Sequence, residues 1–262
     1  MDITGKVVAI TGGANGIGKA LAERFRTEGA KGIAILDIEI DNAQQVADAI
    51  GGIALETDLR SESQIDASIE TVERTLGPID LFCSNAGVLH PDGPDGGVAS
   101  CPNDKWQSSW DVNVMAHVYA ARALVPRMAA RRDGYFLITA SAAGLLSQIG
   151  SAPYSVTKHA AIGFAESLAI THGDDGIKVS VLCPQAVRTR MLGTSKSGGV
   201  AGLDGVMNPE DLTEAVVRGL GEESFLILPH PEVLQYMQNK ANNYDRWIGG
   251  MRKLRRRFRS AA

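Results

Sequence analysis

Short, continuous runs of aliphatic residues recur along the chain, and segments with helical spacing separate them. Runs of this kind are typical of strands that are covered on both faces, as in parallel sheets. The expected strands are 6–11, 32–37, 52–57, 79–84, 134–140, 177–183 and 224–228. The expected helices are 16–29, 41–50, 61–76, 103–131, 153–172 and 209–221. This alternation predicts an α/β fold: a single doubly wound, Rossmann-type domain whose mostly parallel seven-stranded sheet is flanked by helices.

Local signals set the expected boundaries. Ser61 and Gln64 form a capping-box pattern at one helix start, and Asn208 followed by Pro209 predicts another. Residues 193–208 hold five glycines and no periodicity, which predicts a mobile loop that closes over substrate. We expect residues 1–230 to form the dinucleotide-binding and catalytic domain, followed by a C-terminal helical extension with a basic tail over 231–262.

Composition then narrows the functional classes. The 262 residues are 44% hydrophobic and carry a net charge of -4, which gives no reason to expect nucleic acid as a partner. The three cysteines form no CxxC pair, and the five histidines lack metal-ligand spacing, so we expect neither disulfides nor a metal. A strand-like run begins almost at once, and no apolar run approaches the length of a membrane span. We therefore expect a cytoplasmic protein.

A glycine-rich turn follows the first expected strand and opens the first helix. Its glycines, Gly12, Gly16 and Gly18, are spaced more widely than in the common G-x-G-x-x-G pattern, but they would equally let a pyrophosphate approach the backbone and the helix N-terminus. A purely structural turn is the alternative. Asp37 ends the second strand 19 residues after Gly18, where a carboxylate would meet an adenosine ribose, unless it caps the next helix. Asp58 could contact an adenine edge.

Tyr154 and Lys158 are four residues apart just after Pro153, so they share one face at the start of a helix. Alone, this pair would be read as an exposed Tyr/Lys pair. Ser141 ends the fifth expected strand 13 residues earlier, and Asn113 lies on the preceding long helix. The spacing alone does not decide between a solvated surface pair and part of a functional site.

These motifs resemble the short-chain dehydrogenase/reductase family, over about residues 4 to 228. The resemblance is carried by TGGANGIG at 11–18, NAG at 85–87, Asn113, Ser141 and the Tyr154-x3-Lys158 pair. It implies a hydride transfer between NAD(H) and a substrate. The cofactor-binding residues that we expect are Gly12, Asn15, Gly16, Ile17, Gly18, Asp37, Asp58, Leu59, Asn85, Ala86, Gly87, Tyr154, Lys158, Pro184, Val187 and Thr189.

The resemblance also implies catalytic roles. Tyr154 would be the acid/base, and the Lys158 ammonium would favour the phenolate by lowering the phenol's pKa from its usual value of about 10. Lys158 would also bind the nicotinamide ribose, and Ser141 would hydrogen-bond the substrate oxygen. Asn113 would hold a water that links Lys158 to solvent. Thr189 would contact the carboxamide of the cofactor.

One position departs from the family pattern. The family commonly has Pro-Gly where this chain has Pro184-Gln185, so a glutamine side chain would project toward the substrate. The substrate-pocket residues that we expect are Ala142, Leu146, Gln148, Gln185 and Met191. They favour a moderately hydrophobic secondary alcohol or ketone. The alternatives are an epimerase or dehydratase that retains NAD, and a non-enzymatic NAD(H) sensor.

Two expectations concern contacts beyond the substrate. Apolar residues from Tyr244 to Phe258 recur at helical spacing among arginines, which predicts a basic amphipathic helix. Gly249 and Gly250 interrupt it, so we do not expect membrane contact. Docking on a neighbouring subunit, covering the active site and having no contact remain as alternatives. The resemblance suggests a homotetramer, or at least a homodimer, paired through the helices at 103–131 and 153–172. Their small residues that would permit close approach are Ala116, Ala120, Ala123, Ala161 and Ala165.

Overall fold

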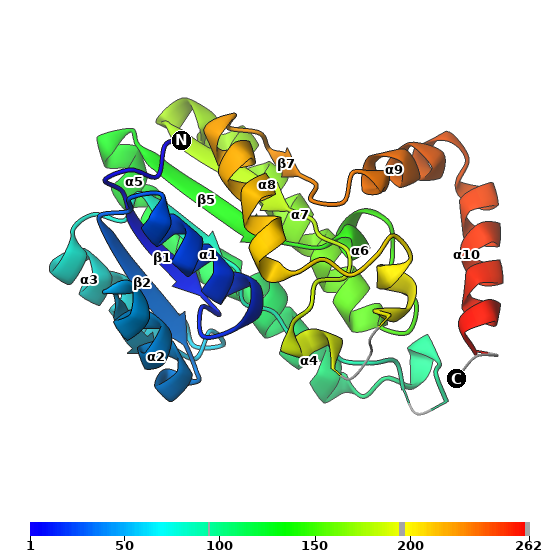
Figure 1. Cartoon of the computed structure of the whole chain (residues 1–262). Coiled ribbons are helices and arrows are strands. Elements are labelled where there is room, and N and C mark those ends of the chain that lie inside the picture. The colour runs from blue at the N-terminus through cyan, green and yellow to red at the C-terminus, as the bar shows by residue number, and fades with distance from the viewer. Residues whose placement is uncertain (94, 194–196, 260–262) are drawn as a thin grey trace.

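The sheet has seven strands, all of them parallel, in the order β3-β2-β1-β4-β5-β6-β7. A computed structural model describes residues 1–93, 95–193 and 197–259 (Figure 1). The strands are β1 Val7–Thr11, β2 Gly32–Asp37, β3 Ile53–Glu56, β4 Leu81–Ser84, β5 Gly134–Thr139, β6 Ile177–Leu182 and β7 Leu226–Ile227. Each lies inside a segment that the aliphatic runs predict, and the predicted α/β fold is confirmed.

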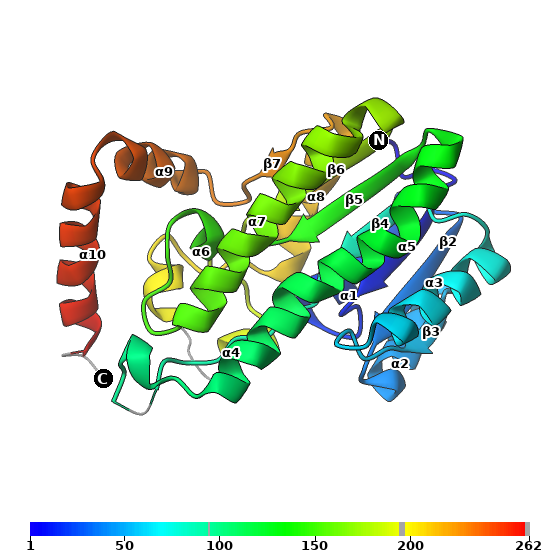
Figure 2. The same cartoon turned by 180° about the vertical axis from the view of Figure 1, so that it is seen from behind.

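Helices cover both faces of this sheet. They are α1 Gly16–Thr27, α2 Ile40–Ile50, α3 Glu62–Leu76, α4 Asn103–Trp110, α5 Ala116–Arg131, α6 Ala142–Leu145, α7 Ala152–His172, α8 Pro209–Gly221, α9 Glu232–Asn242 and α10 Tyr244–Arg259. Helices α1, α2 and α8 pack on one face, and α3, α5 and α7 pack on the other (Figures 1 and 2). Strand side chains alternate between the two resulting cores, so a continuous aliphatic run is needed to fill both.

The strand order places one crevice at the centre of the sheet. Strand β1 pairs with β2 on one side and with β4 on the other, so the chain's direction of winding reverses between β1 and β4. Ligands of open parallel sheets bind outside the carboxyl ends of the strands at such a point. The glycine-rich turn follows β1 and the NAG segment follows β4, so both lie at this crevice.

The predicted helix over 103–131 forms over these residues, with a π-helical turn inside it. A π-helical turn at Asp111–Met115 separates α4 from α5. Such a turn holds one residue more than an α-helical turn, and it turns the buried Asn113 toward α7. The apolar periodicity continues across the interruption, so the sequence pattern does not indicate it.

At two predicted helix N-termini, the side-chain hydrogen bonds differ from those that the sequence predicts. Ser61 accepts a hydrogen bond from the Gln64 backbone N–H at 3.4 Å, but the Gln64 side chain accepts one from the Asp58 backbone instead of returning to Ser61. Only half of the capping box therefore forms. Asn208 precedes α8 as predicted, but its side chain bonds to the Asp211 carboxylate and caps no backbone group.

The predicted mobile loop has hydrogen-bonded structure where it is described. Residues 194–196 lie outside the described part of the chain. Beyond them, Gly199–Gly202 forms a 3₁₀ turn, and Met207 pairs with Val187 in a parallel bridge. The Asp204 carboxylate accepts hydrogen bonds from Gln185 and from the Tyr236 hydroxyl, each at 2.9 Å. Closure over substrate stays a prediction.

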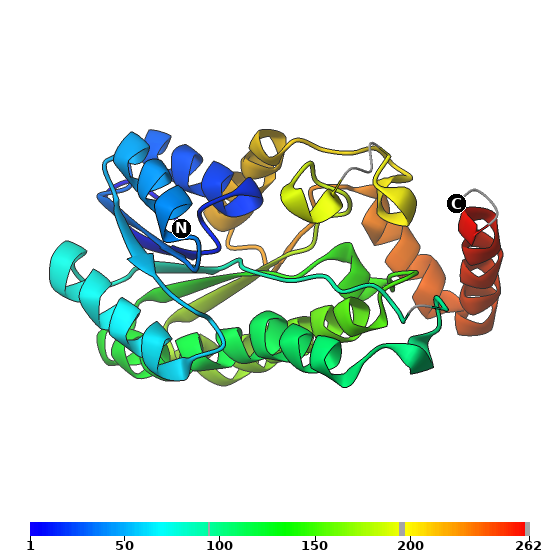
Figure 3. The same cartoon turned by 90° about the horizontal axis from the view of Figure 1, so that it is seen from below.

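The C-terminal extension forms two helices that lead away from the sheet. Helix α9 connects α10 to the domain, and α10 stands apart from the α/β body in Figures 1 and 3. Hydrogen bonds link both helices to the domain: Lys240 of α9 donates to the Leu145 carbonyl at 2.8 Å, and Arg255 of α10 donates to the Gly96 carbonyl at 3.0 Å. Among the helices described, none combines the length and the apolar character that a membrane crossing requires.

The small residues proposed for an oligomer interface pack inside the chain itself. Ala116, Ala120, Ala161 and Ala165 are buried in the core between the sheet and helices α5 and α7, and Ala123 packs against that core. They bring each helix close to its own sheet. These alanines therefore do not provide an interface, and the oligomeric state stays a prediction.

Candidate active site

The glycine-rich turn opens the site at the carboxyl end of β1. Helix α1 begins at Gly16, and the side chain of its N-cap residue, Asn15, makes no capping bond. Asn15 donates instead to the Glu39 carboxylate at 3.1 Å. The first backbone N–H groups of the helix are therefore available to an anion, and the helix dipole favours negative charge there.

Gly18 has a packing role and does not contact the ligand cavity. It is absent from the cavity lining, so its contact with the cofactor stays a prediction. A Cβ atom at Gly18 would lie 2.2 Å from the Gly12 carbonyl oxygen. Only glycine lets α1 begin this close to the turn, so Gly18 positions the other glycines.

Asp37 lies at the outer end of the crevice, with both carboxylate oxygens held by backbone groups. One accepts from the Ala14 N–H and the other from the Glu39 N–H, each at 3.0 Å. Helix α2 begins at Ile40 with Glu39 as its N-cap residue, so Asp37 is not the helix cap. Asp37 also lines the cavity, where its carboxylate has a fixed orientation.

The basic residues near Asp37 are not those that the sequence suggests. Lys19, the nearest candidate by position, pairs with Glu23 and does not line the cavity. Arg60 and Arg190 do line it. Arg60 forms a short ion pair with Asp58 (2.6 Å), which lowers the Asp58 pKa, and Arg190 pairs with Glu39 at 2.8 Å. Arg190 comes from a loop far along the chain, so its position depends on the fold.

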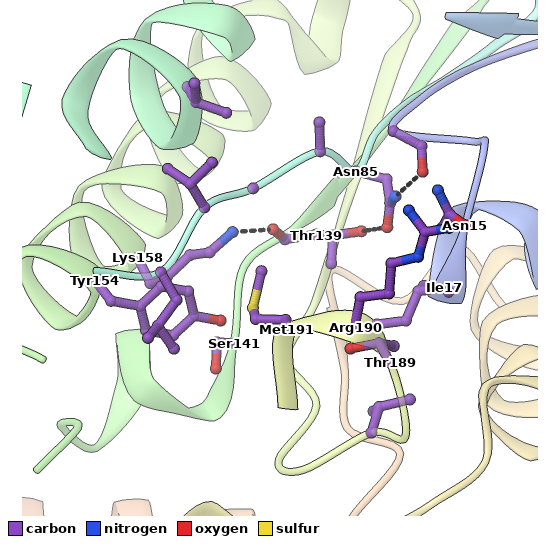
Figure 4. Close-up of a pocket in the computed structure, with 18 of the residues that line it drawn as sticks. Asn15, Ile17, Asn85, Thr139, Ser141, Tyr154, Lys158, Thr189, Arg190 and Met191 are labelled. Carbon is purple, nitrogen blue, oxygen red and sulfur yellow. Dashed lines mark hydrogen bonds between the residues drawn. The ribbon is translucent and has the colours of Figure 1, made fainter. Parts of the chain in front are cut away.

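A hydrogen-bonded network joins the two ends of the site (Figure 4). Asn85 donates to the Thr11 carbonyl at 3.1 Å and accepts from the Thr139 hydroxyl at 3.1 Å. The Thr139 carbonyl in turn accepts from the Lys158 ammonium at 2.8 Å. Because these residues end β1, β4 and β5, the network fixes the carboxyl ends of three strands relative to α7.

Gly87 leaves room for the catalytic groups beside it. A Cβ atom at this position would lie 3.3 Å from the Lys158 nitrogen and 3.2 Å from the Asn113 side-chain oxygen. Asn113 makes three side-chain hydrogen bonds, two with the Val88 backbone and one with Thr157, at 2.8–3.0 Å. They hold the NAG segment against α7. The predicted water link through Asn113 would have to use its backbone carbonyl.

Ser141, Tyr154 and Lys158 converge at the carboxyl end of β5. Ser141 caps the short helix α6, and its hydroxyl accepts from the Ala143 N–H at 3.1 Å. Tyr154 and Lys158 lie one turn apart on α7, with the ammonium 5.7 Å from the centre of the tyrosine ring. In Figure 4 the Tyr154 hydroxyl points toward Ser141. All three side chains are buried.

Burial moves the pKa of both titratable groups toward the neutral form. It lowers the pKa of the Lys158 ammonium to about 8. It raises the pKa of the Tyr154 phenol above its usual value, against the opposing effect of a hydrogen bond with Ser141. In the protein alone, the desolvation of Tyr154 is therefore the dominant effect on its pKa, and a lowering by Lys158 together with the cofactor stays a prediction. A further positive charge near the phenol would be needed to favour the phenolate.

Two cavities meet at Ser141, beside Tyr154. The first, of about 810 Å³, extends from Asp37 and the glycine-rich turn to Tyr154. The second, of about 610 Å³, extends from Ser141 toward α9 and α10. Ser141, Gln148, Gln185 and Ala201 line both.

Most predicted site residues line one of these cavities. Those in the first are Gly12, Asn15, Gly16, Ile17, Asp37, Asp58, Leu59, Asn85, Ala86, Gly87, Ser141, Gln148, Tyr154, Lys158, Pro184, Gln185, Val187, Thr189 and Met191. Ala142 and Leu146 line the second cavity, and Asn113 supports the site from behind. The sequence named no residue of α9 or α10 as part of the site, although covering the active site was one of the roles left open for the amphipathic helix.

This arrangement defines a class of protein: a doubly wound α/β domain with a nucleotide-sized cavity at its switch point and a Ser–Tyr–Lys group for proton transfer at one end. The chain belongs to the short-chain dehydrogenase family, whose family model, described as "short chain dehydrogenase", matches residues 6–198. This confirms the family that the motifs indicated.

Three known proteins illustrate the similarity. A 1-deoxy-11-beta-hydroxypentalenate dehydrogenase of Streptomyces exfoliatus is 34% identical over 238 residues, which cover 88% of this chain and 86% of that one. A short-chain dehydrogenase/reductase from Burkholderia phymatum, solved with NAD, has a TM-score of 0.84 at 24% identity, covering 94% and 96% of the two chains, and it shows the shared fold. A 3-ketoacyl-(acyl-carrier-protein) reductase from Brucella melitensis, solved with NADH, has a TM-score of 0.78 at 27% identity, covering 86% and 97%.

Proposed function

We propose that this protein is an NAD(H)-dependent oxidoreductase that interconverts a moderately hydrophobic secondary alcohol and the corresponding ketone. One observation carries the proposal: Ser141, Tyr154 and Lys158 converge where the two cavities meet. A substrate oxygen at that point can reach a proton donor while its carbon faces the first cavity. This is the geometry that a hydride transfer coupled to a proton transfer requires.

The residues of the first cavity fit a dinucleotide. The uncapped N-terminus of α1 suits a pyrophosphate, and the fixed carboxylate of Asp37 suits the two hydroxyls of an adenosine ribose. When bound, NAD supplies the hydride acceptor at its nicotinamide ring. Lys158, at the opposite end from Asp37, is placed to bind the second ribose, and Thr189 lines the wall beside Gly16.

The catalytic groups divide the proton chemistry between them. During alcohol oxidation, Ser141 orients the substrate oxygen, and the Tyr154 phenolate takes the proton of the hydroxyl group. The carbon that bears this hydroxyl group gives up its hydride to the bound NAD. During ketone reduction, the Tyr154 phenol returns that proton. The positive charges of Lys158 and of an oxidised nicotinamide act against the rise that burial imposes on the Tyr154 pKa. The phenol is therefore suited to release its proton when the oxidised cofactor is bound.

The names of two similar proteins support the substrate class. One is named as a dehydrogenase of a hydroxylated compound, and the other as a reductase of a 3-keto compound. These are the two directions of one reaction between an alcohol and a ketone.

The test is to replace Tyr154 by phenylalanine and to follow NADH at 340 nm across a panel of secondary alcohols. The change removes the proton acceptor but keeps the ring, so turnover should fall by about 10²–10⁴. NAD binding, measured by calorimetry, should be retained. Turnover in Tyr154→Phe above a tenth of the wild-type value, as an order-of-magnitude limit, would contradict the assignment.

A further inference from the structure

One face of α10 lines the second cavity. The lining residues on this helix are Arg246, Trp247, Gly250, Met251 and Leu254. Their spacing of three and four residues places them on a single face of the helix. The apolar members of this face are half-buried, whereas Arg252 and Lys253 on the other side are exposed. The apolar face of the amphipathic helix is therefore turned toward the cavity.

The opposite wall of this cavity belongs to the catalytic domain. It contains Ala142 from α6, Leu146 directly after that helix, and Val200 and Leu203 from the segment that follows Thr189. Trp247 joins the two walls at one end, because it packs in a small apolar cluster with Ala142 and Leu146. The cavity therefore has apolar walls on both sides and begins at the catalytic serine.

The rim beside Trp247 is polar. It is formed by Asn239, Asn242 and Asn243 together with Arg246. A molecule that fills the cavity would place its apolar part between α6 and α10, and a polar group on it would meet these amides or the guanidinium. A ligand with one ring would occupy only the space next to Ser141, because the cavity of about 610 Å³ continues to Leu254.

We infer that α10 is the outer wall of the substrate site and selects alcohols with an extended, multi-ring apolar body. This inference rests on the proposed function. Each additional ring that enters the cavity removes apolar surface from water on both sides, so affinity should increase with ring number. The affinity for small alcohols would not depend on α10.

Two neighbouring glycines on α10 offer a matched test. A Cβ atom built on Gly249 or on Gly250 would have no other atom within 4 Å, so both positions tolerate a larger side chain. Only Gly250 lines the cavity. Leucine is also a better helix former than glycine, so neither Gly250→Leu nor Gly249→Leu should impair folding.

The experiment compares both variants with the wild type on cyclohexanol, decahydro-2-naphthol and a 3-hydroxysteroid. Gly250→Leu should raise KM for the 3-hydroxysteroid by about tenfold or more, because its side chain occupies the space of the distant rings. KM for cyclohexanol should change by less than roughly twofold, and Gly249→Leu should leave all three values within that range. Calorimetric binding of the 3-hydroxysteroid, without turnover, should weaken only in Gly250→Leu.

The outcomes separate the inference from the proposed function. Equal effects of the two variants, or no effect of Gly250→Leu on the multi-ring alcohols, would overturn the role of α10. Activity that does not increase from cyclohexanol to the larger alcohols in the wild type would do the same. If no alcohol yields NADH but the 3-hydroxysteroid still binds in a manner sensitive to Gly250→Leu, the proposed reaction fails while the role of α10 holds.

Discussion

Lys158 illustrates how the site retains a charge in an unfavourable position. Its side chain is 2% exposed, and in the cofactor-free protein only the Thr139 carbonyl is recorded as its hydrogen-bond acceptor among the described residues. Burial lowers its pKa from 10.5 to about 8. A shift of this size corresponds to roughly 3 kcal/mol of unfavourable free energy for the buried ammonium at neutral pH. The charge is retained although the free energy of unfolding would be higher without it.

Replacing Lys158 by methionine should therefore stabilise the cofactor-free protein at pH 7. After allowance for an unpaired Thr139 carbonyl, we expect a gain of about 1–2 kcal/mol, which corresponds to a rise in Tm of roughly 4 °C. Activity should be lost. The exposed Lys31 provides a control, because Lys31→Met removes a charge that carries no such cost.

The pH dependence of this gain has a definite sign. Between pH 8 and 10.5 the unfolded chain still holds the Lys158 proton but the folded protein does not. The wild-type free energy of unfolding therefore gains a rising contribution through this window, and the advantage of Lys158→Met should shrink. Calorimetric scans at pH 7 and pH 10 measure it. A lower Tm for the variant at pH 7 would show that the ammonium stabilises the fold.

Asp37 should determine the choice between the two nicotinamide cofactors. Its carboxylate would repel the 2′-phosphate of NADP by roughly 1–4 kcal/mol at a separation of about 4 Å. Arg60 and Arg190 are paired with Asp58 and Glu39, so neither is held ready for that phosphate. We expect NAD to be preferred by about tenfold or more, and Asp37→Ser to reduce the preference.

The measurement is kcat/KM for NAD and for NADP in the wild type and the variant. Asp41→Ser is the control, because Asp41 is an exposed residue of α2 outside the cavity lining. Equal use of both cofactors by the wild type would show that the Asp37 carboxylate does not discriminate between the 2′-hydroxyl of NAD and the 2′-phosphate of NADP.

At the level of elements, the sequence indicates those whose side chains fill the two cores. All seven strands were predictable because each must supply apolar residues to both faces of the sheet. The short helix α6 was not, because its four residues are too few to show a period. The π-helical turn at Asn113 was not, because it is stabilised by contacts with the NAG segment and α7, which lie far away in sequence.

The same distinction applies to the site. Residues at or just after the end of a strand, such as Gly12, Asp37 and Ser141, could be placed from the sequence because parallel strands end at one edge. Arg190 and the inner face of α10 could not be placed. Their positions depend on the path of the chain after β6, which no periodicity describes.

At the scale of the whole molecule, the outer face of α7 is the best candidate for subunit contact. Val156, Gly163 and Ile170 lie seven residues apart on this face, and Ile170 is 83% exposed. An exposed apolar stripe along a long helix is typical of an interface. We predict a homodimer or homotetramer in solution at micromolar concentration, measured by light scattering.

Ile170→Asp should shift this assembly toward the monomer, because a charge would be buried at the contact. Leu234→Asp is the control, since Leu234 is 50% exposed on α9 and away from the stripe. A monomeric wild type would refute the prediction, and an equal response of both variants would place the interface elsewhere.

The division of the site between two stretches of chain bears on how the protein can evolve. The stretch that matches the family model ends at residue 198 and contains Ser141, Tyr154 and Lys158. Much of the wall assigned to the substrate, including Leu203 and Trp247, lies beyond it. Under that assignment, mutations in the C-terminal helices alter which alcohols are accepted while the proton-transfer groups stay unchanged. Duplicated copies of such a gene could then diverge in substrate under selection, each inheriting a working catalytic centre.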